Sequence, residues 1–499
     1  MEEEKQEITE TKTEKTSQVA LKGMIWAFAE RICAQLVTLI VSIVLARLLS
    51  PSEYAVVAIV TIFVTIANVF VTAGFGSALV QKKDADETDF STTFYFSLVF
   101  SILIYFVLFF TAPLIADFYD MPILTLIIRI MSLRIVVASV NSIQQAFVAK
   151  TLQFKKFFYS TLIGTFASAV VGLTMAYLGC GVWALVGQYL TNVTIDTIVL
   201  SFTCGWKPKL IFVPKRMKSL FSYGWKVMAA SVFHTLSTEA RSLTISKIVS
   251  EEDLSYYNQG EKFPALFINN IETSIQKVMA PIVAREQNDV PRVLELTRKS
   301  MVVATFITWP MLIGLAAVAS PFIEILYTSK WLGSVPYLQL ICLAYLFYPV
   351  GETHVRTLRA LGFSGITLIT VFAADALNII LLIIAFVLKL GGKEIVISWI
   401  ISSVAMALFN GIADWRIVKY KFIDQIKDLL FTGISCAAMF AAVYAFSYLN
   451  LNLILKLVCQ VFLGVTVYLL VSFLINRRSL IYVFRTGKDF LGRFRKKSR

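Results

Sequence analysis

The sequence predicts an all-α polytopic membrane protein with about 14 transmembrane helices. Hydrophobic residues make up 57% of the 499 positions and charged residues only 16%, whereas soluble domains carry roughly 25% charged residues. Apolar runs of about 20 residues recur along the chain, and this length crosses a hydrocarbon core. The ten-residue alternation of a membrane β-barrel is not seen. Helices are then the structure that satisfies its own backbone hydrogen bonds in lipid.

The order of loops predicts how the chain is oriented. The expected spans are 22–48, 54–79, 90–112, 121–149, 157–178, 182–203, 220–247, 261–283, 299–319, 332–353, 365–388, 395–416, 429–448 and 453–476. Because their number is even, both termini lie on one side of the membrane. Most Lys and Arg residues fall in the loops and tails of that side, so the positive-inside rule makes both termini of the multi-pass chain cytoplasmic. The net charge of +14 therefore reflects topology and implies no nucleic-acid partner.

The chain also shows an internal repeat. PLIADFY at 113–119 reappears as PFIEILY at 321–327, and LQFKK at 152–156 as LGFSG at 361–365, an offset of 208 to 209 residues. Six spans in each half give the halves the same orientation, related by an axis along the membrane normal. The predicted segments are a disordered cytoplasmic lead (1–20), an N-terminal six-helix bundle (21–203), a basic inter-bundle loop (204–219), a C-terminal six-helix bundle (220–417), two additional helices (418–476) and a basic cytoplasmic tail (477–499).

Polar side chains form stripes along several spans. Arg31, Gln35, Thr38 and Ser42 have the same i, i+4, i+7, i+11 spacing as Ser231, Thr235, Thr238 and Ser242, which places each set on one helix face. An Arg or Lys at the bilayer centre costs roughly 2.5 to 3.5 kcal/mol, so these stripes predict a water-filled cleft between the halves. Its expected charges are Arg31, Arg129, Arg134, Lys226, Arg241 and Lys277 against Glu30, Glu239 and Glu272.

This excess of cations predicts an anionic cargo, because Arg side chains bind phosphate oxygens bidentately. The predicted substrate-binding residues are Arg31, Arg134, Arg241, Lys277, Gln35, Asn68 and Asn141. Two structural alternatives stay open. Each buried Arg can instead form an ion pair with another helix, and the Ser and Thr hydroxyls can serve helix packing.

The sequence leaves energy coupling open between a proton and a sodium ion, and it predicts no cofactor. The coupling candidates are the intramembrane groups Glu239, Asp375 and His234, with Asp196 as a further carboxylate. Glu352, Arg356 and Arg359 share a helix face near the predicted inner end of the tenth span and are expected to form a surface ion network. No Walker-type loop is present. Six scattered cysteines and two histidines predict neither disulfides nor a metal site.

Several blocks together resemble the polysaccharide-transporter (PST) family of the MOP superfamily, which moves lipid-linked oligosaccharides. They are LARLLSPSEY at 45–54, GFGSALVQKKDADETDFSTTF at 74–94, APLIADFY at 112–119, GVWALVGQ at 181–188 and KWLGSVPYLQL at 330–340. The resemblance implies a pair of six-helix bundles that flips an undecaprenyl-diphosphate-linked repeat unit to the outer leaflet. The product would be O-antigen, capsule, exopolysaccharide or teichuronic acid. By similarity, cleft arginines bind the diphosphate, and Arg31 fits that role best by position.

Three classes of function compete for this sequence. A membrane enzyme would carry its acids and bases in a sizeable extramembrane loop, and the longest predicted loop has about 16 residues. A cation-coupled multidrug antiporter of the same superfamily is the alternative, but its cleft would be acidic or aromatic. A structural scaffold gives no reason to bury charges. The predicted partners are the lipid-linked oligosaccharide, membrane lipids and a polysaccharide polymerase or export machinery.

Overall fold

The computed structural model describes residues 31–485 apart from 73, 83 and 484. All regular secondary structure of these residues is helical, as predicted. Eleven helices of the described part are long and apolar enough to cross a membrane, so the chain is a multi-pass membrane protein. The predicted lead at 1–20 and the tail after 485 lie outside the described residues.

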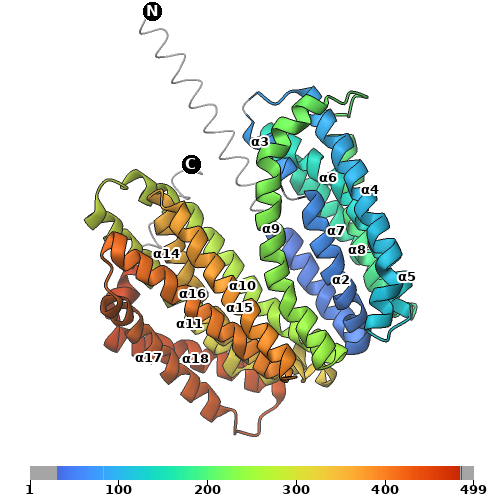
Figure 1. The fold of residues 1–499 in the computed structure, drawn as a ribbon. Helices are drawn as coiled ribbons and strands as arrows, with labels where there is room; N and C mark the ends of the chain where they lie inside the picture. The colour runs from blue at the N-terminus through green and yellow to red at the C-terminus, as the bar shows by residue number, and fades with distance from the viewer. Residues whose placement is uncertain (1–30, 73, 83, 484, 486–499) are drawn as a thin grey trace, which may run out of the picture. The chain divides into compact units, whose positions relative to one another are not determined.

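The chain divides into two compact units, Met1–Leu243 and Thr244–Arg499. The first unit contains the helix Arg31–Leu48, α2 (Pro51–Thr72), α3 (Phe75–Gln81), α4 (Glu87–Phe118), α5 (Ile123–Met131), α6 (Leu133–Lys150), α7 (Phe154–Tyr177), α8 (Val182–Thr203) and most of α9 (Pro214–Ile248). Several of these helices run side by side (Figure 1). The division falls within α9, later in the chain than the inter-bundle loop predicted at 204–219.

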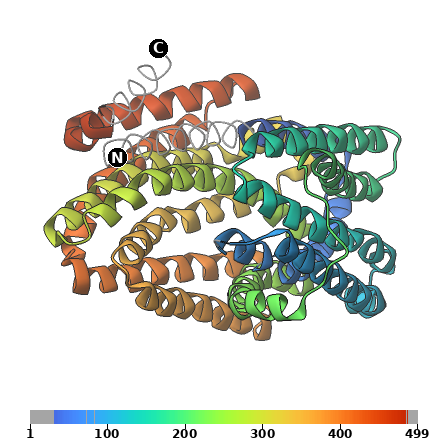
Figure 2. The same cartoon turned by 90° about the horizontal axis from the view of Figure 1, so that it is seen from above.

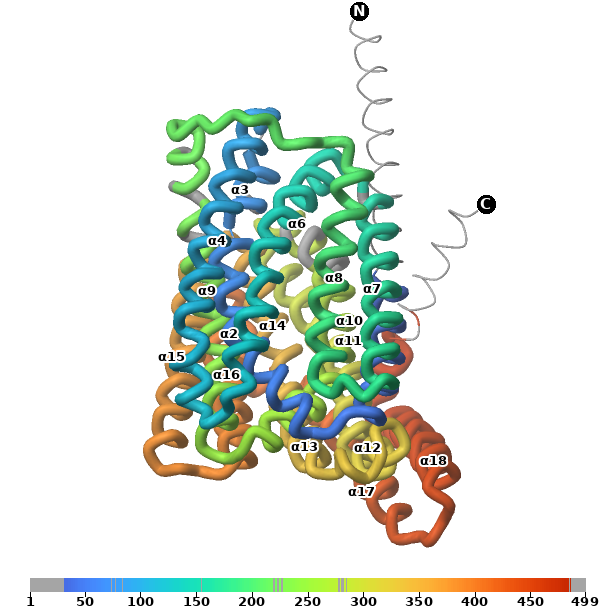
Figure 3. Tube along the Cα trace, turned by 90° about the vertical axis from the view of Figure 1, so that its right-hand side faces the viewer, coloured from blue at the N-terminus to red at the C-terminus, as the bar shows by residue number. Residues whose placement is uncertain are grey.

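The second unit continues with the end of α9 and a further set of helices. These are α10 (Glu251–Arg285), α11 (Val290–Ala317), α12 (Ala319–Tyr327), the short η1 (Ser329–Trp331), α13 (Ser334–Leu346), α14 (Tyr348–Ala360), α15 (Ser364–Val387), α16 (Gly392–Val418), α17 (Phe422–Phe446) and α18 (Leu453–Ile475). The α17–α18 hairpin lies at the edge of this unit, against α11 and α12 (Figures 2 and 3).

Corresponding helices pack in the same way in both units. In the first unit, α6 packs against α4 and α8, and α7 lies along α8. In the second unit, α14 packs against α11 and α16, and α15 lies along α16. The order in which corresponding helices pack is thus the same within each unit.

Two predicted spans are each divided into two helices. The span expected at 121–149 divides at Ser132 into α5 and α6, and the span expected at 332–353 divides at Phe347 into α13 and α14. Pro349 lies in the first turn of α14. Proline is tolerated there because the backbone N–H groups of a first turn have no partner within the helix. Because α14 runs on to Ala360, its last two turns belong to the helix bundle rather than to a loop.

An ionic contact, here called the first clamp, ties α4 to the start of α9. Asp86 caps α4 in a capping box with Asp89, and Arg216 Nη1 lies 2.5 Å from Asp86 Oδ1. Lys82 Nζ lies 2.6 Å from Oδ2 of the fully buried Asp89. The Arg216 guanidinium holds the pKa of Asp86 below its usual value. The contribution of this ion pair is therefore lost as the pH falls through that lowered pKa.

The second clamp occupies the corresponding place in the second unit. Arg298 of α11 donates two hydrogen bonds of 2.8 Å to the carboxylate of Asp428 in α17, and Tyr420 Oη donates to the same carboxylate at 2.6 Å. In the first clamp the acids precede the base Arg216 along the chain, and in the second clamp the base Arg298 precedes the acid Asp428.

Candidate functional site

A polar seam joins α6 and α8 in the first unit. The guanidinium of Arg134 lies over the ring of Tyr189, 5.7 Å from its centroid. About two turns further along α6, Asn141 Nδ2 donates to Asp196 Oδ2 at 3.0 Å. Gln145 Nε2 donates to Asn141 Oδ1 at 2.6 Å. The predicted residues Arg134 and Asn141 therefore share one seam. Both polar atoms of the Asn141 amide form hydrogen bonds, Nδ2 with Asp196 and Oδ1 with Gln145.

Three other predicted binding residues lie in the same unit. Arg31 and Gln35 are half-buried, one turn apart on the helix Arg31–Leu48. Arg31 has no ion-pair partner within the described part of the chain. Asn68 is half-buried on α2, and its Oδ1 is buried with no hydrogen-bond partner among the described residues. Arg31 is thus half-buried without an ion-pair partner in the described chain, and Asn68 has one buried oxygen left unpaired there.

The predicted residues on α9 differ in their surroundings. Arg241 is 5% exposed and Glu239 is half-buried, whereas His234 is exposed. Of the two predicted residues in the second unit, Asp375 is half-buried on α15, and the side chain of Lys277 lies outside the described residues. Each of these sites stays a prediction.

One expected cleft charge has a helix-packing contact instead. The guanidinium of Arg129 lies 4.2 Å from the ring centroid of Phe109, and its Nε donates to the Phe109 carbonyl at 3.2 Å. Both contacts tie α5 to α4. Arg129 thus connects two helices, through a ring and a carbonyl rather than through the ion pair considered above.

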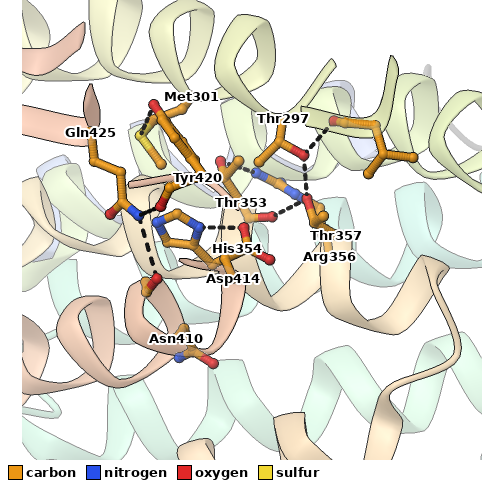
Figure 4. A network of polar contacts seen from close by, with 12 residues as sticks. Thr297, Met301, Thr353, His354, Arg356, Thr357, Asn410, Asp414, Tyr420 and Gln425 are labelled. Atoms are coloured by element: carbon orange, nitrogen blue, oxygen red, sulfur yellow. Dashed lines mark hydrogen bonds and ion pairs between the residues drawn. The ribbon is translucent and has the colours of Figure 1, made fainter. Parts of the chain in front are cut away.

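The second unit contains a buried polar network that centres on α14 (Figure 4). Arg356 Nη1 donates to Glu272 Oε2 of α10 at 2.6 Å, and its Nη2 donates to Thr353 Oγ1 at 3.0 Å. Both side chains of the ion pair are only 8% exposed. The expected surface network of Glu352, Arg356 and Arg359 is thus wrong for Arg356, because α14 continues into the bundle and turns this side chain toward α10.

A buried histidine–aspartate pair joins α14 to α16 within this network. His354 Nδ1 and Asp414 Oδ2 are 2.7 Å apart, linking α14 to α16, and both side chains are fully buried. When Asp414 is ionised, Nδ1 donates this hydrogen bond, because a carboxylate only accepts. Neither His354 Nε2 nor Asp414 Oδ1 has a hydrogen-bond partner among the residues that the structure describes. The pair can therefore accept a further proton at Nε2.

Neighbouring groups complete the surroundings of the pair. Gln425 Nε2 donates to the carbonyl of Tyr420 at 2.9 Å. A methyl group added at Gly411 would lie 3.5 Å from His354 Nε2 and 2.9 Å from Gln425 Oε1, so the histidine nitrogen and the amide oxygen both adjoin this glycine. The Tyr420 ring lies 6.0 Å from the imidazole, centroid to centroid. An amide oxygen on this side suits an imidazolium N–H.

The sequence did not predict this pair, because the tenth span was expected to end before His354. A boundary at 353 leaves His354 in a loop, and the helix in fact continues to Ala360. A signal was present in the twelfth span, since Asn410 and Asp414 are four residues apart and share a face of α16. Both are fully buried, and Asn410 accepts a hydrogen bond from Thr370 at 2.7 Å.

Comparison with known proteins gives the chain its relatives. The profile of a family described as polysaccharide biosynthesis protein matches residues 44–336. The teichuronic acid biosynthesis protein TuaB of Bacillus subtilis is 24% identical over 335 residues, which cover 65% of this chain and 67% of TuaB. The succinoglycan biosynthesis transport protein ExoT of Rhizobium meliloti is 24% identical over 319 residues, covering 64% of this chain and 65% of ExoT.

Solved structures share the fold. The lipid II flippase MurJ in an inward closed conformation superposes with a TM-score of 0.75 at 18% identity, covering 92% of this chain and all of that one. An inward-facing multidrug transporter of the MATE family, also of the MOP superfamily, gives a TM-score of 0.59 at 12% identity over 77% of this chain and 94% of its own. At these identities the likeness concerns the fold alone.

Proposed function

The chain belongs to the polysaccharide biosynthesis protein family within the MOP superfamily, and from that premise we propose that it flips a lipid-linked oligosaccharide from the inner to the outer leaflet. The family match carries the proposal, since it spans more than half of the chain, and the names of TuaB and ExoT connect relatives with polymer assembly and transport. The proposed cargo is an undecaprenyl-diphosphate-linked repeat unit for a surface polysaccharide, moved by alternating access in the cytoplasmic membrane, with both termini in the cytoplasm.

The proposed binding groups for the diphosphate and its sugars are Arg31, Arg134, Arg241, Lys277, Gln35, Asn68 and Asn141. Support is uneven among them. Arg31 and Asn68 keep polar atoms without a partner in the described chain, whereas Asn141 is held between Asp196 and Gln145. We therefore assign the diphosphate first to Arg31, whose planar guanidinium suits phosphate oxygens.

A deletion strain tests the proposed cargo. We expect the lipid-linked oligosaccharide to accumulate on the inner leaflet of cells that lack the protein, and to be cleared when the gene is restored. Efflux of cationic dyes, measured in the same cells, serves as the control. Unchanged lipid intermediates together with reduced dye efflux would instead favour the multidrug antiporter, whose fold this chain shares.

For energy coupling we propose a proton that binds at the His354–Asp414 pair. Ionisable groups buried in membrane helices mark proton and substrate pathways, and histidine changes charge near neutral pH. The pair would cycle between an imidazole–carboxylate with one negative charge and an imidazolium–carboxylate without net charge. Tyr420, which donates to Asp428, and the Glu272–Arg356 ion pair are ionisable groups of the same part of the unit. Glu239, Asp375 and His234 remain the further candidates.

Asp414→Asn is expected to remove the response of transport to a proton gradient. The amide keeps the size of the side chain but gives the imidazolium no counter-charge. The measurement is the appearance of lipid-linked oligosaccharide in the outer leaflet of proteoliposomes, with and without an imposed pH difference. If the variant keeps the wild-type acceleration by the gradient, the pair is not the coupling site.

Histidine labelling tests the same site without any cargo. The chain has two histidines, so His354 is the only one left in a His234→Asn background. With ¹⁵N-labelled histidine, the two ring nitrogens report whether one or both carry a proton, and a proton-exchange role requires both states to appear when the pH is varied. A ring that keeps one protonation state at every pH tested contradicts a proton-exchange role, whatever the cargo.

A further inference from the structure

A cavity of about 520 Å³ opens in the second unit, away from the buried histidine–aspartate pair. Its walls come from the start of α11, the start of α17 and the helical segment 477–483 that follows α18. The polar lining residues are Glu295, Arg298, Lys299, Asp428, Arg478, Ser479 and Tyr482. Pro291, Leu294 and Val302 form an apolar side. The cavity thus combines several hydrogen-bond donors with a hydrocarbon wall.

The charges in this cavity leave a surplus of cations. Asp428 is already held by Arg298 and Tyr420, and Glu295 is shared between Lys299 and Arg292. Arg478 is exposed and has no ion-pair partner in the described part of the chain. Asp428 and Glu295 are thus already paired with cations. An anion that enters the cavity would contact Arg478 and the N–H groups of Arg298 and Lys299 that are not bonded to these two acids.

The chain itself indicates the depth of the cavity in the membrane. α18 is one of the eleven candidate spans, and Phe473, Leu474 and Ile475 at its end are exposed. Arg477 and Arg478 follow directly after them. Apolar residues that face lipid and then give way to arginines mark the boundary between acyl chains and headgroups. The mouth of the cavity, which includes Arg478, therefore lies at headgroup depth.

We propose that this cavity binds the phosphodiester headgroup of an anionic membrane phospholipid. Arg478 and Lys299 would contact the phosphate, Ser479 and Tyr482 would supply neutral donors, and the acyl chains would follow the apolar surface of α18. Basic pockets between membrane helices on the cytoplasmic side bind anionic lipid headgroups in this way, and the positive-inside rule predicts that side for this end of α18. The bound lipid would link the segment after α18 to α11.

Titration of lipids into the full-length protein in a neutral detergent tests this site. We expect short-chain phosphatidylglycerol to bind about tenfold more tightly than short-chain phosphatidylcholine, because one charge-assisted contact is worth about one decade of affinity. Arg478→Gln should reduce the affinity for phosphatidylglycerol to that for phosphatidylcholine. Arg477→Gln is the matched control, since Arg477 stacks on Phe473 and does not line the cavity, and it should keep the wild-type preference.

Other outcomes would overturn the proposal. Equal affinity for both lipids, or an unchanged preference in Arg478→Gln, removes the anionic site. Inorganic phosphate that competes at the same concentration as phosphatidylglycerol shows that free phosphate, and not a lipid, is the ligand. Lys299→Gln provides a second variant if Arg478→Gln fails to fold, and the same loss of preference is expected. The assay involves no transport, so its result is independent of the flippase proposal.

Discussion

Glu272→Ala is expected to destabilise the protein by about 3 to 5 kcal/mol, the usual cost of removing one partner of a buried ion pair. The change leaves the Arg356 guanidinium between α10 and α14 with Thr353 Oγ1 as its remaining acceptor among the described residues. At 8% exposure this charge has little access to water. The measurement is the free energy of unfolding in mixed micelles with increasing dodecyl sulfate.

Two further variants separate lost charge from lost packing. Arg359→Ala changes an exposed arginine of the same helix and should alter the free energy of unfolding by less than about 0.5 kcal/mol. The double change Glu272→Leu and Arg356→Met should recover most of the loss, because an apolar pair leaves no charge in the bundle. A loss below about 1 kcal/mol in Glu272→Ala would show that water or another acceptor reaches Arg356.

Arg31→Ala is expected to abolish polymer export while the protein is still made and inserted. If Arg31 binds the diphosphate through two charge-assisted hydrogen bonds, each worth about 1.5 to 3 kcal/mol, headgroup binding weakens by at least about a hundredfold. The measurement is surface polysaccharide in a complemented deletion strain, together with protein level in the membrane fraction.

The controls for Arg31 use the same position and the same helix. Arg31→Lys should restore part of the export, since it returns the charge without the planar pair of donors. Arg47→Ala changes an exposed arginine near the other end of the helix and should leave export normal. Full export by Arg31→Ala would remove this residue from headgroup binding.

Hydrophobic length predicted the helical elements well where nothing interrupts the apolar run. The span expected at 182–203 coincides with α8, and the span at 453–476 differs from α18 by one residue. The breaks at Ser132 and Phe347 were not predicted, because each apolar run passes without a loop signal into a more polar helix, and only Pro349 marks the second break. Helix ends in polar sequence were also missed, as at Ala360, since the bundle buries the polar last turns of α14.

Periodicity identified faces but not partners. It placed Arg134 and Asn141 on one side of a helix, and both do meet α8. It could not show that Asp196 binds Asn141, because that contact joins residues 55 positions apart. The His354–Asp414 contact has the same character, with 60 positions between its members. Such pairs depend on how helices pack, which the spacing within one helix does not encode.

The opposite polarity of the two clamps bears on whether the halves of the chain can be exchanged. The first clamp carries its acids at the start of α4 and its base on α9, whereas the second carries its base on α11 and its acid on α17. A chimera that placed a copy of the first half before α17 would bring the acids of α4 toward Asp428, and juxtaposed like charges repel. We therefore expect each half to function only with the helix that follows it.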